Sequence, residues 1–240
     1  MNMNANTKYE FVEGDTVATP SGVILRRIRA LVAIPRHGVE VGDLGGYVQA
    51  EQNLNSDDAW VSGNAQVSGN ARVCGDARVY GDAQVFGNAW VYGDAQVFGN
   101  AWVYGDAQVY GNAQVFGNAR VYGNARVSGD AQVCGDARVY GDARVYGDAQ
   151  VSGNARVSGN ASFLMIGPIG SRRAMLNIYA DAKIGVRFST GCFTGSREQF
   201  FAVVTDTHGD SEHGNAYAVA LMLADVLVKP CEIEQLAEAA

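Results

Sequence analysis

Residues 77–97 read ARVYGDAQVFGNAWVYGDAQV. Within this stretch valine, glycine and alanine each return every six residues, and aspartate or asparagine follows every glycine. The period extends in both directions, from Val61 to Val157, so that seventeen valines recur without a slip. The repeating unit is V-x-G-[DN]-A-x, and a fold for this chain must explain that period first.

Each position of the unit has a physical reason. Around every valine the residues alternate between small or apolar and outward-facing, which is the periodicity of a strand. The glycine and the Asn or Asp after it tolerate the left-handed backbone of a tight corner. Three such edges close an 18-residue triangular turn with the valines inside. The repeat therefore predicts a mainly β protein, built on a left-handed parallel β-helix.

The flanks of the repeat differ from it and from each other. Residues 1–47 contain short apolar runs separated by Pro- and Gly-containing turns, which predicts a small N-terminal β cap. An imperfect entry turn, with Val48 and Leu54 in valine positions, assigns residues 48–162 to the β-helix. Residues 163–240 predict a C-terminal ββαα unit: an apolar alternating hairpin, then a helix that begins at the capping box Ser196–Gln199 and a second helix with its own apolar face.

Composition excludes several classes of function. Hydrophobic residues make up 48% of the chain and the net charge is −7, with no strongly basic region, so nothing indicates a nucleic-acid partner. The apolar run 216–228 is too short to span a membrane and contains Asp225, and the N-terminus has no apolar leader. The four cysteines lack metal-ligand or disulfide spacing, so we expect no metal and no cofactor. These observations predict a cytoplasmic protein.

The 18-residue period assigns outward side chains to three faces. Two faces combine arginine with aromatic residues and form the candidate binding face for an anionic or planar partner. Its residues are Trp102, Tyr104, Arg120, Tyr122, Arg138, Tyr140, Arg126, Arg144 and Tyr146. The remaining face is nearly uncharged and is the candidate face for a homo-oligomer or for docking of the C-terminal unit. Its residues are Gln96, Phe98, Gln114 and Phe116.

A simpler interpretation of these columns stays open, in which they only stabilise the stack. Aromatic pairs add to stability by themselves, and the arginines could be compensated by corner aspartates such as Asp136 and Asp142 or by stacking on tyrosine. Calcium is not expected, because the preference of the corner for Asn and Asp already explains them and calcium-binding β-rolls use a nine-residue repeat.

The residues argue against the usual enzymes of this fold. Most hexapeptide β-helix proteins are acyltransferases with a histidine base, but His37, His208 and His213 all lie outside the repeat. One catalytic alternative remains: Cys192 in a glycine-rich turn, with His208 and His213 downstream, allows a Cys–His nucleophile to be drawn. A structural role for these residues is the simpler interpretation, because reactivity requires a thiol of low pKa.

Several stretches together resemble the hexapeptide-repeat proteins that phages and prophages encode. The motifs lie on both flanks and at the start of the repeat: GDLGGYV at 42–48, QNL at 52–54, AWVSGNAQV at 59–67, IGPIGSRR at 166–173, STGCFTGS at 189–196 and DTHGDSEHGNAY at 206–217. The resemblance implies a phage accessory protein acting in a bacterial cytoplasm, with no established activity to transfer.

The leading hypothesis from the sequence is a non-enzymatic phage or prophage protein whose rigid β-helix binds a host component. That component is a host protein or a small anionic ligand, and the binding would inhibit a bacterial defence system. Two alternatives stay open. One is an acyltransferase-like or Cys192-dependent enzyme, and the other is a structural virion or assembly protein.

Overall fold

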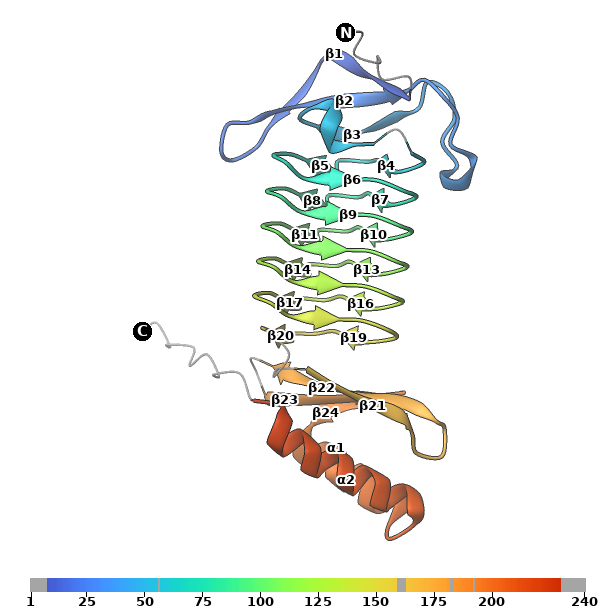
Figure 1. Cartoon of the computed structure of the whole chain (residues 1–240), viewed down its shortest axis with the longest axis vertical. Helices are drawn as coiled ribbons and strands as arrows, with labels where there is room; N and C mark the ends of the chain where they lie inside the picture. Colours follow the sequence, from blue (N-terminus) through green and yellow to red (C-terminus); the bar gives the residue numbers. More distant parts are fainter. Residues whose placement is uncertain (1–7, 56, 159–162, 182–183, 192, 230–240) are drawn as a thin grey trace.

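The chain folds into a parallel β-solenoid that carries a β cap at one end and a sheet with two helices at the other (Figure 1). This arrangement comes from a computed structural model, which describes residues 8–55, 57–158, 163–181, 184–191 and 193–229. The turns of the solenoid stack along the long axis of the molecule, so that the two end units lie far apart.

The strands of the solenoid form three parallel sheets, in which each residue pairs with the residue 18 positions later. The arginine face consists of β5 (Gln66–Val67), β8 (Gln84–Val85), β11 (Trp102–Val103), β14 (Arg120–Val121), β17 (Arg138–Val139) and β20 (Arg156–Val157). The glutamine face consists of β4 (Trp60–Val61), β7 (Arg78–Val79), β10 (Gln96–Val97), β13 (Gln114–Val115), β16 (Gln132–Val133) and β19 (Gln150–Val151). The groove face consists of β6 (Arg72–Val73), β9 (Trp90–Val91), β12 (Gln108–Val109), β15 (Arg126–Val127) and β18 (Arg144–Val145).

The core of the solenoid is a column of valines and alanines. Every repeat valine from Val61 to Val157, and every repeat alanine from Ala59 to Ala155, is fully buried. Each buried valine contributes on the order of 1.5–3 kcal/mol before the cost of ordering the chain. The predicted inward positions are therefore confirmed along the whole repeat.

The corners require glycine for two reasons. The repeat glycines from Gly63 to Gly153 have φ between 61° and 75°, a region that L side chains rarely adopt. In addition, a Cβ on Gly123 would lie 2.9 Å from the backbone nitrogen of Gly141 in the next turn. Successive corners therefore approach each other too closely for any side chain.

The residue after each glycine forms a polar ladder along the corners. Asparagine side-chain amides donate to the carboxylate or amide oxygen one turn below. The hydrogen-bonded pairs are Asn64 to Asp82, Asn70 to Asn88, Asn88 to Asp106, Asn100 to Asn118, Asn112 to Asp130, Asn118 to Asp136 and Asn124 to Asp142, at 2.8–3.3 Å. An asparagine at a corner thus supplies a donor and avoids the repulsion between two stacked carboxylates.

The N-terminal cap is an antiparallel extension of the arginine face. Its strands are β1 (Tyr9–Ala18), β2 (Ile24–Ala30) and β3 (Leu44–Val48), and 3₁₀ turns lie at Pro35–His37 and Glu51–Asn53. β3 then pairs in parallel with β5, and Leu54 forms a parallel bridge with Val73. Val48 and Leu54 are buried in the valine column, as the entry turn predicted.

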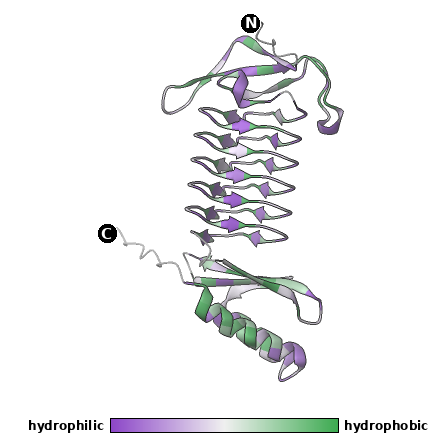
Figure 2. Cartoon of the chain, viewed as in Figure 1, coloured by the Kyte–Doolittle hydropathy of each residue, from purple (hydrophilic) through white to green (hydrophobic). Residues whose placement is uncertain are grey.

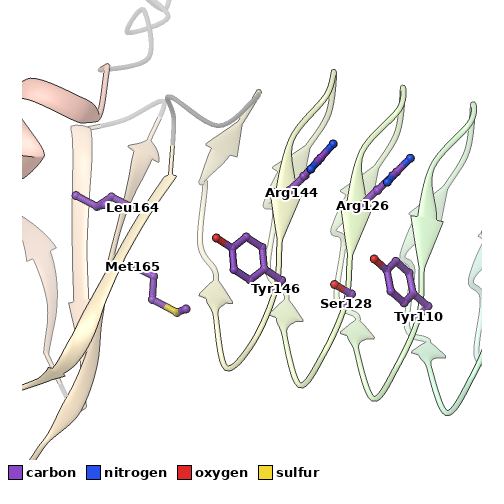
Figure 3. Close-up of a pocket in the computed structure, with 7 residues that line it drawn as sticks. All are labelled: Tyr110, Arg126, Ser128, Arg144, Tyr146, Leu164 and Met165. Carbon is purple, nitrogen blue, oxygen red and sulfur yellow. The ribbon is translucent and has the colours of Figure 1, made fainter.

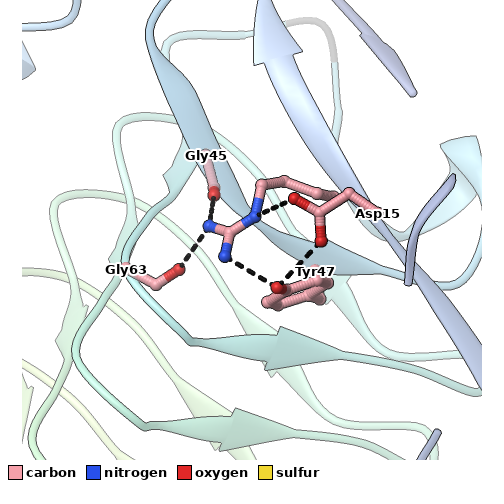
Figure 4. Close-up of polar contacts among 5 residues, drawn as sticks. Asp15, Gly45, Tyr47 and Gly63 are labelled. Atoms are coloured by element: carbon pink, nitrogen blue, oxygen red, sulfur yellow. Dashed lines mark hydrogen bonds and ion pairs between the residues drawn. The ribbon is translucent and has the colours of Figure 1, made fainter. Parts of the chain in front are cut away.

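Side chains of the cap bind the open backbone edge of the first turns. The buried Lys8 ammonium donates to the carbonyls of Asn55, Asp57 and Ala59. Arg27 donates to the Gly63 carbonyl and is oriented by Asp15 and Tyr47 (Figure 4). These contacts protect an edge that would otherwise pair with another strand.

Asn53 completes this protection from the entry turn. Its side-chain amide donates to the carbonyls of Gly69 and Ala71 at 3.0 and 2.9 Å. Asn53 is fully buried, and its side-chain oxygen accepts from the Ala50 backbone N–H. The open edge is therefore saturated by a lysine, an arginine and an asparagine of the cap.

The C-terminal unit is a four-stranded antiparallel sheet covered by two helices. Its elements are β21 (Phe163–Ile169), β22 (Ala174–Asp181), β23 (Gly185–Thr190), β24 (Phe193–Ser196), α1 (Arg197–His208) and α2 (Glu212–Leu227). The sheet has four strands where the sequence predicted a two-stranded hairpin. β21 was missed because it follows the repeat directly, and β24 was missed because it is only four residues long.

β22 is buried on both faces because it lies between the solenoid and the helices. Leu176 and Ile178 pack with Phe200 of α1 in the core of the C-terminal unit. Tyr179 points the other way, joins the core of the solenoid and lies 3.4 Å from the Ser152 hydroxyl. Tyr179 therefore closes the C-terminal end of the valine column.

Both predicted helices are present, with one correction. Ser196 caps α1 through the predicted box, and Gly209 ends it. The spacing of Phe200, Val203 and Val204 predicts that all three are buried, but Val203 is 46% exposed. Position 203 lies about 100° from Val204 around the helix, so the two cannot share the narrow face that α1 presents to the sheet. No helix among the described residues is long and apolar enough to cross a membrane.

Candidate ligand-binding groove

Aromatic side chains form continuous stacks along the solenoid. Neighbouring rings are parallel, with centroids 4.8–5.2 Å apart, and the stacked pairs are Tyr80–Phe98, Phe98–Phe116, Phe86–Tyr104, Tyr104–Tyr122, Tyr122–Tyr140 and Tyr92–Tyr110. The spacing equals that of the strands, since one ring projects from each turn. These ladders confirm the aromatic columns that the 18-residue period predicted.

The stack on the groove face is interrupted. Its column reads Tyr92, Tyr110, Ser128 and Tyr146, so a serine stands where one ring is missing. Tyr146 has no stacked neighbour among the described residues and is 58% exposed. Within the solenoid, residues 60–157, Ser128 is the only non-aromatic residue between two aromatic ones in such a column.

A half-open cavity of about 520 Å³ lies over this interruption (Figure 3). It is lined by Tyr110, Arg126, Ser128, Arg144, Tyr146, Leu164 and Met165. Figure 3 shows Ser128 between the two tyrosines, with the arginines projecting from the same strands. Leu164 and Met165 come from β21, so the C-terminal sheet closes one end of the groove. A cavity with an apolar wall and a few polar groups is the usual form of a small-ligand site.

Two arginines supply the positive charge of the groove. Arg126 and Arg144 are stacked one turn apart and both are exposed. Among the residues that the structure describes, neither makes an ion pair with a carboxylate. The corner aspartates that were expected to compensate such arginines instead accept hydrogen bonds from asparagine, as Asp142 does from Asn124. The groove therefore has the charge to attract an anion.

The arginine face presents the other part of the candidate binding face. Arg120 and Arg138 pair on adjacent strands, and the Arg120 guanidinium lies 5.0 Å from the ring centroid of Trp102. Its column from Phe86 to Tyr140 is an unbroken stack. Tyr104, Tyr122 and Tyr140 thus leave no free ring position, in contrast to the groove face.

The glutamine face is flat and partly buried. Gln96, Gln114, Phe98 and Phe116 are each of intermediate exposure, and the two phenylalanines stack at 4.9 Å. The Tyr80 hydroxyl donates to Gln96 at 3.2 Å. The C-terminal unit does not dock on this face, because its sheet covers the end of the solenoid.

A second apolar surface lies on the outer side of α2. Val219, Met222, Leu223 and Val226 are exposed by 57%, 69%, 43% and 76%. They recur at helical spacing, opposite the face that packs on the sheet. Figure 2 shows hydrophobic residues along much of this helix and hydrophilic ones toward its N-terminal end. The sequence predicts one apolar face on this helix, which is the buried stripe that contains Tyr217 and Leu221, and the exposed stripe is additional to it.

The histidines and cysteines do not assemble into one catalytic group within the described residues. His37 lies beside the solenoid, where burial and then Arg78 and Arg36 lower its pKa. His208 and His213 lie together at the α1–α2 turn, with ring centroids 5.9 Å apart. Cys192 lies outside the described residues, so its proposed pairing with these histidines is not tested. No group of three potential metal ligands occurs in the described part of the chain.

Burial raises the pKa of both cysteines that project from the solenoid, Cys74 and Cys134. These thiols are therefore less reactive than an ordinary cysteine. Neither lies in the groove. The site found here thus contains aromatic rings, guanidinium groups and a hydroxyl, and these are groups for binding.

Sequence reasoning found part of this site and missed the rest. Arg126, Arg144 and Tyr146 were assigned to the candidate binding face, and the structure brings them together. Ser128 was missed although the period gives its position, because a small side chain was not treated as a signal. Leu164 and Met165 belong to a different unit, so no repeat pattern could have placed them there.

Comparison with known proteins identifies the repeat. A family model described as YdcK Beta solenoid repeat matches residues 65–81, 71–85, 83–97, 95–111, 113–129, 119–135, 131–147 and 149–162. The two flanking units lie outside these matches. No curated protein matches the chain. The repeat region of this chain is thus similar to the YdcK beta-solenoid repeat.

Proposed function

We propose that this protein is a non-enzymatic binding protein, whose rigid solenoid holds a host molecule in the groove over Ser128. The observation that carries the proposal is a preformed cavity of about 520 Å³, lined by two arginines that make no ion pair with any carboxylate of the described residues. A solenoid whose turns are tied together by parallel strands loses little conformational entropy when a ligand binds, which favours affinity.

We propose further that the coil is a left-handed hexapeptide β-helix and that the protein is a phage or prophage accessory acting in the bacterial cytoplasm. The six-residue period and the resemblance to the hexapeptide-repeat proteins of phages and prophages support the handedness, and the resemblance of both flanks supports the origin. In that setting, capture of a host protein or a small anionic ligand would inhibit a bacterial defence system.

The test is native mass spectrometry of the full chain purified from bacterial lysate. We expect a stoichiometric adduct on the wild-type protein, and its loss from an Arg126→Gln, Arg144→Gln double variant. The matched control is Arg120→Gln with Arg138→Gln, which removes the same charge from the arginine face. Adduct-free wild-type protein in every lysate fraction would overturn the proposal.

One observation favours an enzyme as the second candidate. Gly191, Phe193 and His208 line a smaller hollow of about 270 Å³ at the C-terminal unit. Cys192 itself lies outside the described residues. A Cys192→Ala variant with unchanged biological effect would remove the Cys192-dependent version. The acyltransferase-like version lacks a histidine in the solenoid. Detection of the protein in purified virus particles would indicate a structural role in the virion.

We also propose that the chain forms a homo-oligomer. Two surfaces are available for it: the glutamine face with Phe98 and Phe116, and the outer side of α2 with Met222 and Val226. Residues on α2 expose more apolar area than the partly buried rings of the glutamine face. A stripe at helical spacing can also pack against its own copy.

A further inference from the structure

We propose that the interruption of the tyrosine stack at Ser128 is a slot for one planar aromatic ring, and that the groove binds a nucleoside monophosphate. The ring would occupy the missing position between Tyr110 and Tyr146, and the phosphate would lie on Arg126 and Arg144. This inference rests on the proposed function and adds to it the chemical class of the ligand.

The size of the slot follows from the ladder itself. Tyr92 and Tyr110 stack with centroids 4.9 Å apart and an interplanar angle of 4°. Tyr110 and Tyr146 are two turns apart, which at the spacing of parallel strands is about 9.6 Å. A ring placed midway would therefore lie about 4.8 Å from each tyrosine, within the range of stacked aromatic pairs.

The slot is accessible, and no side chain of the described residues occupies it. Ser128 is too small to fill the position, and its side chain is of intermediate exposure. Tyr146 leaves 58% of its surface exposed at the margin of the cavity. A flat ligand would cover both tyrosine rings, and stacking on aromatic side chains is how proteins commonly hold bases without reading their identity.

The anionic part of the ligand is indicated by the neighbouring column. Arg126 and Arg144 precede Ser128 and Tyr146 by two residues, so the backbone column that carries the arginines lies about 6.6 Å to one side of the column that carries the slot. A ribose spans such a distance between a base and its phosphate. The two arginines are one turn apart, which allows both to donate to one phosphate group.

The opposite side of the slot has the opposite charge. Asp130 and Asp148 follow Ser128 and Tyr146 by two residues, at the corner toward the glutamine face. Carboxylates there repel a phosphate and accept hydrogen bonds from exocyclic amino groups of a base. Leu164 and Met165 add an apolar wall beyond Tyr146. The groove thus orients the ligand, with the phosphate toward the arginines and the base toward the aspartates.

The experiment is isothermal titration calorimetry of the full chain with adenosine 5′-monophosphate. Ribose 5-phosphate lacks the ring and adenosine lacks the phosphate, so each removes one half of the proposed contacts. The decisive variant is Ser128→Tyr, which completes the ladder and fills the slot with the protein's own ring. The control Ser62→Tyr also adds a ring to the end of a ladder, next to Tyr80 on the glutamine face, and leaves the groove unchanged.

We expect the monophosphate to bind wild type and Ser62→Tyr equally, and Ser128→Tyr at least about 10-fold more weakly. Both truncated ligands should lose at least about 10-fold in affinity on the wild type. Equal binding of ribose 5-phosphate and the monophosphate would overturn the ring slot. A lysate adduct that depends on Arg126 and Arg144 but persists in Ser128→Tyr would overturn the inference while leaving the proposed function intact.

Discussion

Arg36 of the N-terminal cap reaches down the side of the solenoid and contacts Asp76, with 2.6 Å between Nη1 and Oδ2. Its other terminal nitrogen contacts Asp94, one turn below. Asp76 and Asp94 are stacked carboxylates, and no asparagine donor stands between them. Arg36 therefore offsets the repulsion between these two carboxylates, as asparagine donors do at other corners. It also connects the segment around Pro35–His37 to two turns of the solenoid.

Replacing Arg36 with alanine should destabilise the first turns by about 0.5–1 kcal/mol, since the contact is exposed but bridges two repelling charges. Urea titration measures this loss in the free energy of unfolding. The loss caused by Arg36→Ala should be smaller at high salt, because salt screens the repulsion between Asp76 and Asp94. Arg29→Ala is the control, as it removes only an exposed pair with Glu10. Identical losses in the two variants would contradict the bridging role.

The corner glycines offer a matched pair of substitutions. Gly123 and Gly153 have φ of +70° and +66°, but an added Cβ meets Gly141 at 2.9 Å in the first case and only Arg187 at 3.9 Å in the second. We expect Gly123→Ala to cost more than about 2 kcal/mol and Gly153→Ala about 1–2 kcal/mol, the cost of the backbone conformation alone. Thermal unfolding measures the difference. Equal melting temperatures would show that the turns relax around the extra methyl group.

Lys8 should make stability depend on pH in the alkaline range. Desolvation by burial lowers its pKa from 10.5 to about 8. Between these values the unfolded chain binds more protons than the folded one, so the free energy of unfolding rises with pH, by up to about 1.4 kcal/mol per pH unit. Lys8→Met should remove this rise. The urea midpoints of the wild type and of Lys8→Met are measured from pH 8 to 10, and the difference between them should change with pH. Parallel pH profiles would rule out a neutral Lys8.

Tyr179 should hold the C-terminal unit to the solenoid. Its ring is fully buried beneath the last turn, so Tyr179→Ala should cost about 3–5 kcal/mol. Tyr179→Phe loses only the 3.4 Å contact with Ser152 and should cost about 0.5–1 kcal/mol. Limited proteolysis before β21 and thermal unfolding measure both effects. Resistance of Tyr179→Ala to cleavage would mean that other contacts hold the sheet in place.

The outer side of α2 should be the stronger contact between copies. Met222→Glu with Val226→Glu places two charges on the stripe and should shift the mass, measured by light scattering after size exclusion, toward that of one chain. Phe98→Glu with Phe116→Glu is the corresponding variant of the glutamine face, and we expect it to leave the mass unchanged. The reverse result would assign the contact to the glutamine face.

The sequence predicted the solenoid well because its repeat leaves no freedom of register. Once Val85 faces inward, the period fixes Val103, the corners and the aromatic columns, and the structure agrees at each position. The end units were predicted less well, since each occurs once and depends on contacts distant in sequence. Asn177 and Tyr179 of β22 illustrate this: both are polar, yet both are buried because the strand has a packed layer on each side.

The candidate site was predicted in part for the same reason. The positions of Arg126, Arg144 and Tyr146 follow from the period. So does the position of Ser128, where the aromatic column lacks a ring. The cavity also needs the wall supplied by Leu164 and Met165, whose position depends on how the C-terminal sheet packs against the last turn. No local pattern encodes that packing. The exposed stripe of α2 was missed because an apolar helix is ordinarily assigned wholly to a core.

The identity of successive turns gives this architecture a modular length. Residue i pairs with residue i+18 throughout the repeat, so deleting or duplicating any block of 18 residues preserves the corner sequence, both end caps and the facing of every side chain. Unequal recombination between repeats would therefore yield folded proteins of different length. It would also decide which turn lies beside Leu164 and Met165, so a whole-turn exchange changes the content of the groove while the fold is retained.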